Sequence, residues 1–373
     1  MPFRTFSPAR QTATLITTAP LAQQVWRELV LLRHTGATHN IKTPDEIAPW
    51  IDQAKTYFLD AIKSDWRSAG LLYYYSFLNI SKALLVAKGI LDYQTLHTTA
   101  IYHGLSASSQ AITDLTTFEI SIFPSTFRNK QNIFAHLYQA VTNHNWPHNA
   151  ELTIPLSDFS PYCVDITTEQ SQLFSILPRV TTVESLVRGT QKEVWLDMIV
   201  PIVNADEIIR QVKGYPLHRV QALNDFDLHD YLLAYDRKVN HFTSYTCVRG
   251  PSTNITPPQT QIDAFNAVQT EAVKQLARFA VPPVQESSDS NPDWLFVPDI
   301  TLHGISMPWH PLLSDYLLAF ALSTILRYQP QLLVDGSKNQ FLSEAWCSQS
   351  PISCLRYFLM LLTQPSLRIT ANA

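Results

Sequence analysis

The stretch Ser68–Gly89, SAGLLYYYSFLNISKALLVAKG, decides the fold of this chain. It contains no Pro, and Gly89 stands where a residue in the left-handed conformation commonly ends a helix. Apolar side chains surround it except along a narrow polar stripe formed by Ser76, Asn79 and Lys82. Because a helix that is apolar nearly all round is normally buried by other elements, we predict a central helix here.

The polar stripe supplies two candidate ligand-binding residues, Asn79 and Lys82. A Lys on a buried helix must either carry its ammonium to the surface along its own aliphatic stem or be paired. The first interpretation is purely structural. In the second, Lys82 lines a binding pocket.

Composition limits the classes of protein that the chain can belong to. It has 373 residues, 46% of them hydrophobic and 16% charged, with a net charge of -4. The negative charge disfavours a surface wholly given to nucleic acid, although it permits a local basic groove. The four cysteines form no CxxC pair, and no apolar run approaches the roughly 20 residues of a membrane span. We therefore expect a cytoplasmic protein with reduced thiols, no cofactor and no membrane segment.

The pattern of the chain changes twice along its length. Helical spacing predominates over residues 1–145 and again over 301–373, whereas short Val-, Ile- and Thr-rich runs between Pro, Asn and Gly occupy 146–300. We predict an α+β fold, predominantly α, in which the two helical parts pack into one bundle and the middle is a β-containing insertion. Predicted helices cover 19–35, 43–63, 68–89, 107–117, 126–143, 261–279, 310–328, 338–346 and 352–362. Predicted strands cover 151–156, 162–166, 193–200, 217–222, 241–248 and 294–297.

Three segments resemble the YaaC-like family of bacterial proteins. They are WRSAGLLYYYSFLNISKALLVAKG (66–89), YHGL (102–105) and DYLLAFALSTILRYQP (315–330). The first two are also similar to HEPN domains, which are small helical bundles. The resemblance implies a HEPN-like helical bundle, and it implies either a protein that only binds partners or a metal-independent ribonuclease.

HEPN ribonucleases use an Arg and a His four to six residues apart on one helix, where Arg stabilises phosphate charge and His transfers protons. Arg33 and His39 match this spacing, but Gly36 lies between them. Arg128 and His136 are farther apart on a segment predicted to be helical. The simpler interpretation of all four is that they are ordinary surface residues.

Other catalytic signatures are missing from the sequence. It contains no G-x-S-x-G, no Walker A motif and no G-x-G-x-x-G. His144 and His148 have the spacing of a zinc helix, but Pro147 interrupts it. The acidic run NDFDLHD (224–230) is more typical of a solvated turn than of a metal site. We therefore predict no metal.

The end of the 310–328 helix supplies two further candidates, Arg327 and Tyr328. Arg at a helix C-terminus is favoured by the dipole and can bond the last carbonyls, so capping competes with ligand contact. His103, which precedes Gly104 in a predicted turn, has either a loop-locking or a ligand-binding role.

We favour a non-catalytic interaction or ligand-sensing protein that acts with a partner protein or as a homo-oligomer, with antiviral defence as one setting. The alternatives are a ribonuclease or toxin and a small-molecule or nucleotide binder with Lys82, His103 and Arg327 around one cavity.

Overall fold

The computed structural model describes residues 18–35, 41, 44–98, 101–107, 112, 114–189, 193–211, 218–219, 245–250, 253–254, 263, 280–281 and 294–363. The chain divides into two compact units. The helical unit comprises the described residues between 18 and 178 and between 300 and 363, and the sheet unit comprises those between 179 and 299. The fold is α+β with helices predominating, as the sequence predicts. The division predicted at residues 145 and 300 stays a prediction.

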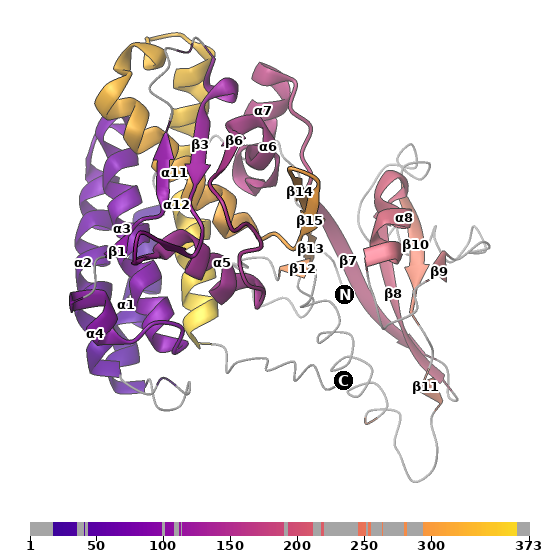
Figure 1. Ribbon diagram of the computed structural model, residues 1–373. Helices are drawn as coiled ribbons and strands as arrows, with labels where there is room; N and C mark the ends of the chain where they lie inside the picture. The colour runs from indigo at the N-terminus through magenta and orange to yellow at the C-terminus, as the bar shows by residue number, and fades with distance from the viewer. Residues whose placement is uncertain are drawn as a thin grey trace. The chain divides into compact units, whose positions relative to one another are not determined.

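Helix α3 (Trp66–Ala87) lies at the centre of the helical unit. It packs against α2 (Pro44–Lys63), α11 (Pro311–Tyr328) and α12 (Lys338–Thr363), so that segments from both ends of the sequence lie side by side (Figure 1). Asp65 caps its start by accepting from the backbone N–H of Arg67 at 2.9 Å. Gly89 follows its end at φ +65°, which confirms the predicted left-handed residue.

Two faces of α3 carry aromatic side chains into the core. On one, Tyr73 and Phe77 meet the ring of Trp346 edge-on, with centroids 6.1 and 6.3 Å away. On the other, Tyr74 meets Tyr316 and Phe320 of α11 at 5.8 and 5.4 Å. These edge-to-face contacts stabilise the bundle beyond simple area burial.

The rest of the helical unit consists of shorter elements around this core. Its further helices are α1 (Thr18–Thr35), α4 (Tyr93–Thr98), α5 (Ile133–Thr142), α6 (Leu156–Phe159) and α7 (Thr167–Phe174), with 3₁₀ turns η3 (Leu115–Thr117), η4 (Ser160–Tyr162), η5 (Val164–Ile166) and η7 (Pro330–Leu333). Its strands are β1 (Ile101–Tyr102), β2 (Leu105–Ala107), β3 (Glu119–Ile122), β4 (Thr126–Phe127), β5 (Lys130–Asn132), β6 (Leu152–Pro155), β14 (Ile300–Leu302) and β15 (Ile305–Met307).

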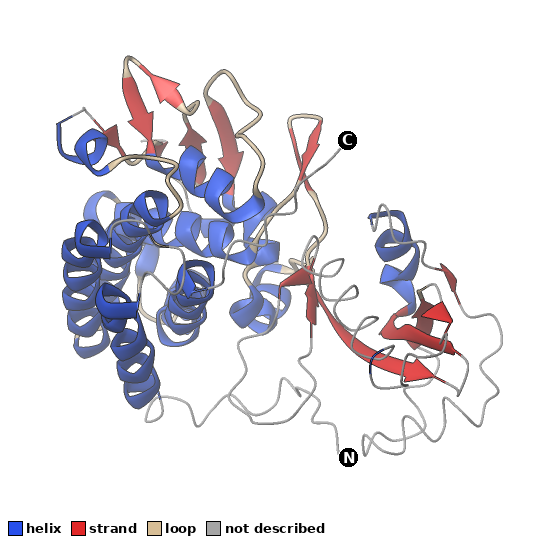
Figure 2. Ribbon diagram, turned by 90° about the horizontal axis from the view of Figure 1, so that it is seen from below, coloured by secondary structure: helices blue, strands red, loops and turns tan. Residues whose placement is uncertain are grey.

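These strands form three small sheets, in the orders β1-β5-β4, β2-β3-β6 and β14-β15. In the second sheet β3 pairs antiparallel with both neighbours, and its inward residues Ile120 and Ile122 are fully buried. Figure 2 shows the short strands of this unit gathered to one side of its helices.

The sheet unit contains β7 (Thr181–Gly189), β8 (Glu193–Pro201), α8 (Ile202–Gln211), β9 (His218–Arg219), β10 (Tyr245–Arg249), β11 (Thr253–Asn254), β12 (Ala280–Val281) and β13 (Trp294–Phe296). The strand order is β12-β13-β7-β8-β10-β9, and β11 also pairs with β8. A buried Asp197 on β8 accepts from Arg249 on β10 at 2.6 and 2.9 Å. The predicted strands at 193–200, 241–248 and 294–297 are confirmed in the described residues.

The helix predicted over 126–143 is wrong in its first half. Residues 126–132 form the β4–β5 hairpin, and α5 begins only at Ile133. Arg128 and Asn129 occupy the two-residue turn at φ 49° and 59°. Positive φ at both central positions matches the twist of a hairpin and is incompatible with a helix.

Three other predicted elements also differ. The described part of 107–117 is the end of β2 and η3, not a helix. The strand predicted at 162–166 is replaced by 3₁₀ turns, because Cys163 N–H bonds to Ser160 O and Pro161 favours the turn. The two helices predicted over 338–362 form one helix, α12, in which Pro351 is buried. Packing of α12 on α3 outweighs the cost of about 3 kcal/mol for an internal Pro.

The helix predicted at 261–279 and most of the strand predicted at 217–222 lie outside the described residues. None of the helices within the described ranges is both long and apolar enough to cross a bilayer.

Candidate interaction surface

Three exposed apolar side chains lie close together in the sequence where α11 is followed by η7 and α12. Tyr328 is 70% exposed, Val334 59% and Phe341 50%. They are three of the eight large hydrophobic residues found exposed among those described, and they fall within 14 residues of sequence. We call Tyr328, Val334 and Phe341 the α11–α12 corner. Grouped exposure of this kind is typical of interaction surfaces, whereas single exposed apolar residues are common everywhere.

The backbone of the corner is held by buried polar contacts. Asn339 Nδ2 donates to Leu332 O at 3.0 Å, and its Oδ1 accepts from Leu115 N–H at 3.1 Å. Asn339 is buried, so it joins η7, α12 and η3 in one fixed arrangement. The exposed side chains are therefore presented from ordered backbone.

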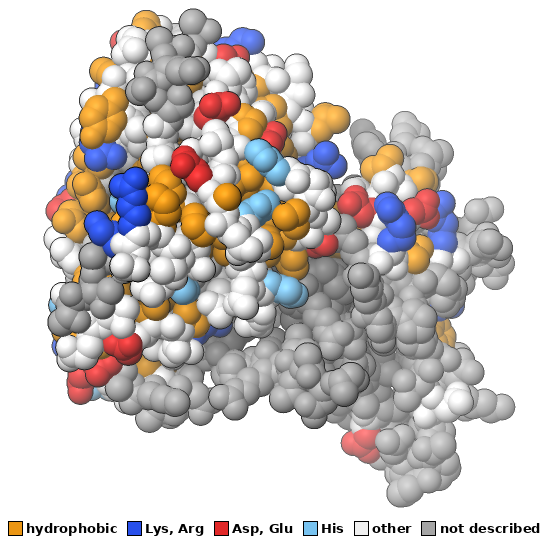
Figure 3. Space-filling model, in the orientation of Figure 1, with side chains coloured by type: hydrophobic (Ala, Val, Ile, Leu, Met, Phe, Trp, Pro, Cys, Tyr) orange, Lys and Arg blue, Asp and Glu red, His pale blue; other side chains and the backbone are white. Residues whose placement is uncertain are grey.

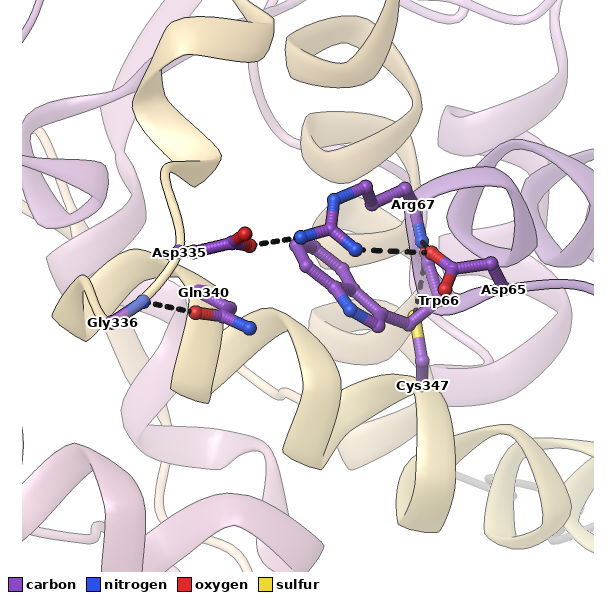
Figure 4. A network of polar contacts seen from close by, with 7 residues as sticks. All are labelled: Asp65, Trp66, Arg67, Asp335, Gly336, Gln340 and Cys347. Atoms are coloured by element: carbon purple, nitrogen blue, oxygen red, sulfur yellow. Dashed lines mark hydrogen bonds and ion pairs between the residues drawn. The ribbon is translucent and has the colours of Figure 1, made fainter.

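A second set of polar contacts fixes the same segment to the start of α3 (Figure 4). The guanidinium of Arg67 bridges the carboxylates of Asp65 and Asp335. Gly336 N–H donates to the Gln340 side chain in the first turn of α12. Because these side chains are largely in water, we assign them a positioning effect and little net stability.

Arg327 acts on its own helix. Its Nε donates to Ser323 O at 2.9 Å, and its guanidinium carbon lies 5.2 Å from the centre of the Tyr328 ring. This is the carbonyl contact expected near a helix C-terminus, and the cation–π contact also orients Tyr328. Arg327 therefore belongs to the rim of the corner.

His103 contacts the middle of α11. Its ring lies 5.5 Å from Phe320 and 6.4 Å from Tyr74, and its Nδ1 accepts from Leu105 N–H at 3.2 Å. Partial burial and then the charge of Arg327 lower the pKa of His103, so the neutral ring predominates at pH 7. The structure thus brings His103, Arg327 and Tyr328 to one region, and the bond to Leu105 gives His103 the predicted loop-locking role.

The YHGL turn itself is held by Asn132. Gly104 has φ +81°, and the Asn132 amide lies directly beneath it. Asn132 Nδ2 donates to Phe123 O and Pro124 O, while its Oδ1 accepts from Ala135 N–H and caps α5. This motif has a structural explanation that needs no ligand.

The other two candidate residues, Asn79 and Lys82, contact Tyr75 and Trp50. Asn79 is buried and donates to Tyr75 O of its own helix at 2.9 Å. The Lys82 ammonium lies 4.4 Å from the Trp50 ring centre, and burial lowers the pKa of Lys82. Lys82 contacts Trp50, whereas His103 contacts Phe320 and Tyr74. The single cavity predicted around Lys82, His103 and Arg327 stays a prediction. Lys82 is explained by a cation–π contact along its own stem.

The Arg–His pairs are separated as well. Arg128 is in the β4–β5 turn over the Phe127 ring, whereas His136 is on α5 with Nε2 2.8 Å from Gln131 Oε1. Burial lowers the pKa of His136. Arg33 pairs with Asp52 at 3.5 Å, and His39 lies outside the described residues. The predicted common helix for Arg128 and His136 is therefore wrong.

Sequence reasoning missed a buried acid. Asp315 on α11 is 1% exposed, and its Oδ1 accepts from Trp346 Nε1 at 3.1 Å. The thiols of Cys163 and Cys354 lie near it and slightly lower its pKa. Burial, followed by the charge of Asp165, holds the pKa of Asp315 well above its usual range. The sequence does contain a signal for this buried acid, because Asp315 directly begins the apolar run DYLLAF (315–320).

Within the described residues, no group of His, Cys, Asp and Glu side chains is arranged to hold a metal ion. His144 Nδ1 instead bonds its neighbour Thr142 O at 2.8 Å, and the His148 ring packs on Trp146. The run 224–230 lies outside the described residues.

Figure 3 shows hydrophobic side chains reaching the surface of the helical unit, with Lys and Arg side chains beside them. The YaaC-like Protein family matches residues 14–355, and the chain belongs to this family. No curated protein matches the chain, and no solved structure matches it. The similarity to HEPN domains stays a prediction.

Proposed function

We propose that the chain is a non-catalytic interaction protein of the bacterial cytoplasm that binds a partner protein through the α11–α12 corner. The observation that carries the proposal is the grouping of three large exposed apolar side chains on backbone fixed by buried contacts. Such residues lose water on binding, and pre-ordering removes part of the entropic cost of association.

The surroundings of the corner support a protein partner. Aromatic residues and Arg are enriched at protein interfaces, and Tyr328 with its stacked Arg327 supplies both. The exposed Asp335, which pairs with Arg67, adds a polar group beside Val334 in the chain. A ribonuclease mechanism lacks such support, because Arg128 and His136 lie on separate elements.

The test compares tagged chains purified from their native cells. We expect one protein to co-purify in stoichiometric amount with the wild type and to fall at least tenfold with Tyr328→Ser combined with Phe341→Ser. The matched control is Leu177→Ser, since Leu177 is 75% exposed in the same unit but outside the corner. It should leave the partner bound.

Two results would refute the proposal. One is equal loss of the partner in the corner and control variants. The other is enrichment of cleaved RNA that disappears with His136→Ala, which would make the chain a nuclease. A defence role is tested in the same strains, in which the corner variant should lose protection against phage whenever the wild type confers it.

A further inference from the structure

A groove between α1 and α2 lies outside the α11–α12 corner. Its volume is about 430 Å³, within the range of about 300–1,000 Å³ found for binding pockets, and it is lined by Gln23, Arg27, Val30, Leu31, Lys55 and Leu59. The buried side of the same helix pair holds Trp26 against Phe58, with ring centroids 5.6 Å apart. The groove is therefore on the side of the pair that this core contact leaves open.

The spacing of the lining residues makes the groove continuous along both helices. Gln23, Arg27 and Leu31 are four residues apart and share one face of α1, as Lys55 and Leu59 do on α2. Eight residues of α1 span about 12 Å, so the groove matches roughly two turns of a bound helix.

The chemistry of the groove is apolar with positive charge and no acid in its lining. Leu31 is 47% exposed, and Val30 and Leu59 are partly exposed. Neither Arg27 nor Lys55 forms an ion pair with another described residue, whereas Arg33 on the same helix pairs with Asp52. Two cations that form no ion pair within the described part of the chain, beside exposed apolar surface, complement an acidic, apolar ligand.

We infer that this groove binds an acidic amphipathic helix of a partner protein. Apolar side chains spaced three or four residues apart would cover Val30, Leu31 and Leu59, and Glu or Asp side chains would meet Arg27 and Lys55. A nucleic acid fits less well, because binding through phosphates needs several cations and gains nothing from an apolar floor. The inference concerns a second surface and does not depend on the corner.

The probe is a fluorescein-labelled synthetic peptide of about 14 residues, roughly four helical turns, with Leu on one face and Glu on the other. Its binding to the full chain is measured by fluorescence anisotropy. We expect saturable binding that weakens as salt increases, because salt screens exposed charges. The same peptide with Lys in place of Glu, or with Ser in place of Leu, should bind at least tenfold more weakly.

Variants of the chain locate the binding. Leu31→Asp should weaken binding of the acidic peptide at least tenfold, and the matched control Leu177→Asp should not. Arg27→Glu combined with Lys55→Glu should also weaken binding of the acidic peptide at least tenfold, since it reverses both charges of the groove.

Several results would overturn the inference. These are failure of the acidic peptide to bind, equal binding of the Lys peptide, and equal weakening by Leu177→Asp. Self-association that Leu31→Asp abolishes in sedimentation would show that a second copy occupies the groove instead. Binding of labelled RNA that the same variant abolishes would also contradict it. Because Tyr328→Ser should leave peptide binding unchanged, failure here is distinguishable from failure of the corner proposal.

Discussion

The substitution Gly104→Ala should destabilise the helical unit strongly. Gly104 has φ +81°, a conformation that residues with a side chain rarely adopt. A Cβ at this position would lie 1.5 Å from Oδ1 of Asn132 and 2.0 Å from its Cγ. Asn132 is fully buried, so its side chain can make room only by giving up its own hydrogen bonds.

The size of the effect follows from what Asn132 would lose. Its bonds to Phe123 O and Pro124 O contribute about 1 kcal/mol each, and its cap on Ala135 N–H contributes about 1 kcal/mol. The left-handed conformation costs an Ala about 1 kcal/mol more than Gly. We therefore expect Gly104→Ala to lower the free energy of unfolding by about 4 kcal/mol.

A double-mutant cycle followed by urea denaturation separates the two causes. Asn132→Ala alone should cost about 3 kcal/mol, since it removes the same bonds without the clash. Adding Gly104→Ala to it should cost only about 1 kcal/mol more, because the obstructing amide is gone. Additive losses in the double variant would refute the reasoning, as would a loss below about 1 kcal/mol for Gly104→Ala alone.

Two further predictions concern buried polar groups. His310 caps α11 by accepting from Leu312 N–H at 3.0 Å, and burial lowers its pKa from 6.5 to about 3. Its contribution to stability is therefore present above pH 6.5 and lost as pH falls toward 3, at about 1.4 kcal/mol per pH unit. His310→Asn keeps a capping oxygen and should show a shallower loss in urea titrations at successive pH values; equal slopes would contradict this. Trp346→Phe should cost about 1–3 kcal/mol by removing the donor to Asp315, more than Trp26→Phe, whose indole N–H has no hydrogen-bond partner in the described structure. Similar losses in the two Trp variants, measured by urea denaturation, would contradict this account.

The central helices could be predicted because their own residues decide them. The apolar run of 68–89 can be buried only inside a bundle, and Gly89 ends it as expected. The helix predicted at 310–328 is confirmed as α11 for the same reason. Here local preference and tertiary packing agree.

The hairpin at 126–132 could not be predicted in the same way. Phe127, Ile133 and Phe134 have helical spacing, and Arg128-Asn129 is not one of the glycine-containing pairs that mark a two-residue turn. Pairing of β5 with β1, which is distant in sequence, determines the structure instead. Local spacing contains no information on such a partner.

The candidate surface was predicted only in part. The sequence identifies Arg327 and Tyr328 as the end of a helix. The exposure of Tyr328, however, depends on the direction that the chain takes through η7 after the helix ends. Val334 and Phe341 join them because Asn339 and the Arg67–Asp335 contact fix that turn, and both involve residues far apart in sequence. Sequence spacing alone therefore could not define the corner.

The most direct test of the proposed interaction places a photo-crosslinking amino acid at single positions in living cells. With the benzophenone side chain at position 328, 334 or 341, we predict a crosslinked adduct to one and the same protein, and none from position 177. These positions are all exposed, so access to solvent does not distinguish them. Adducts of equal yield from position 177, or none from the three corner positions, would contradict a partner-binding corner.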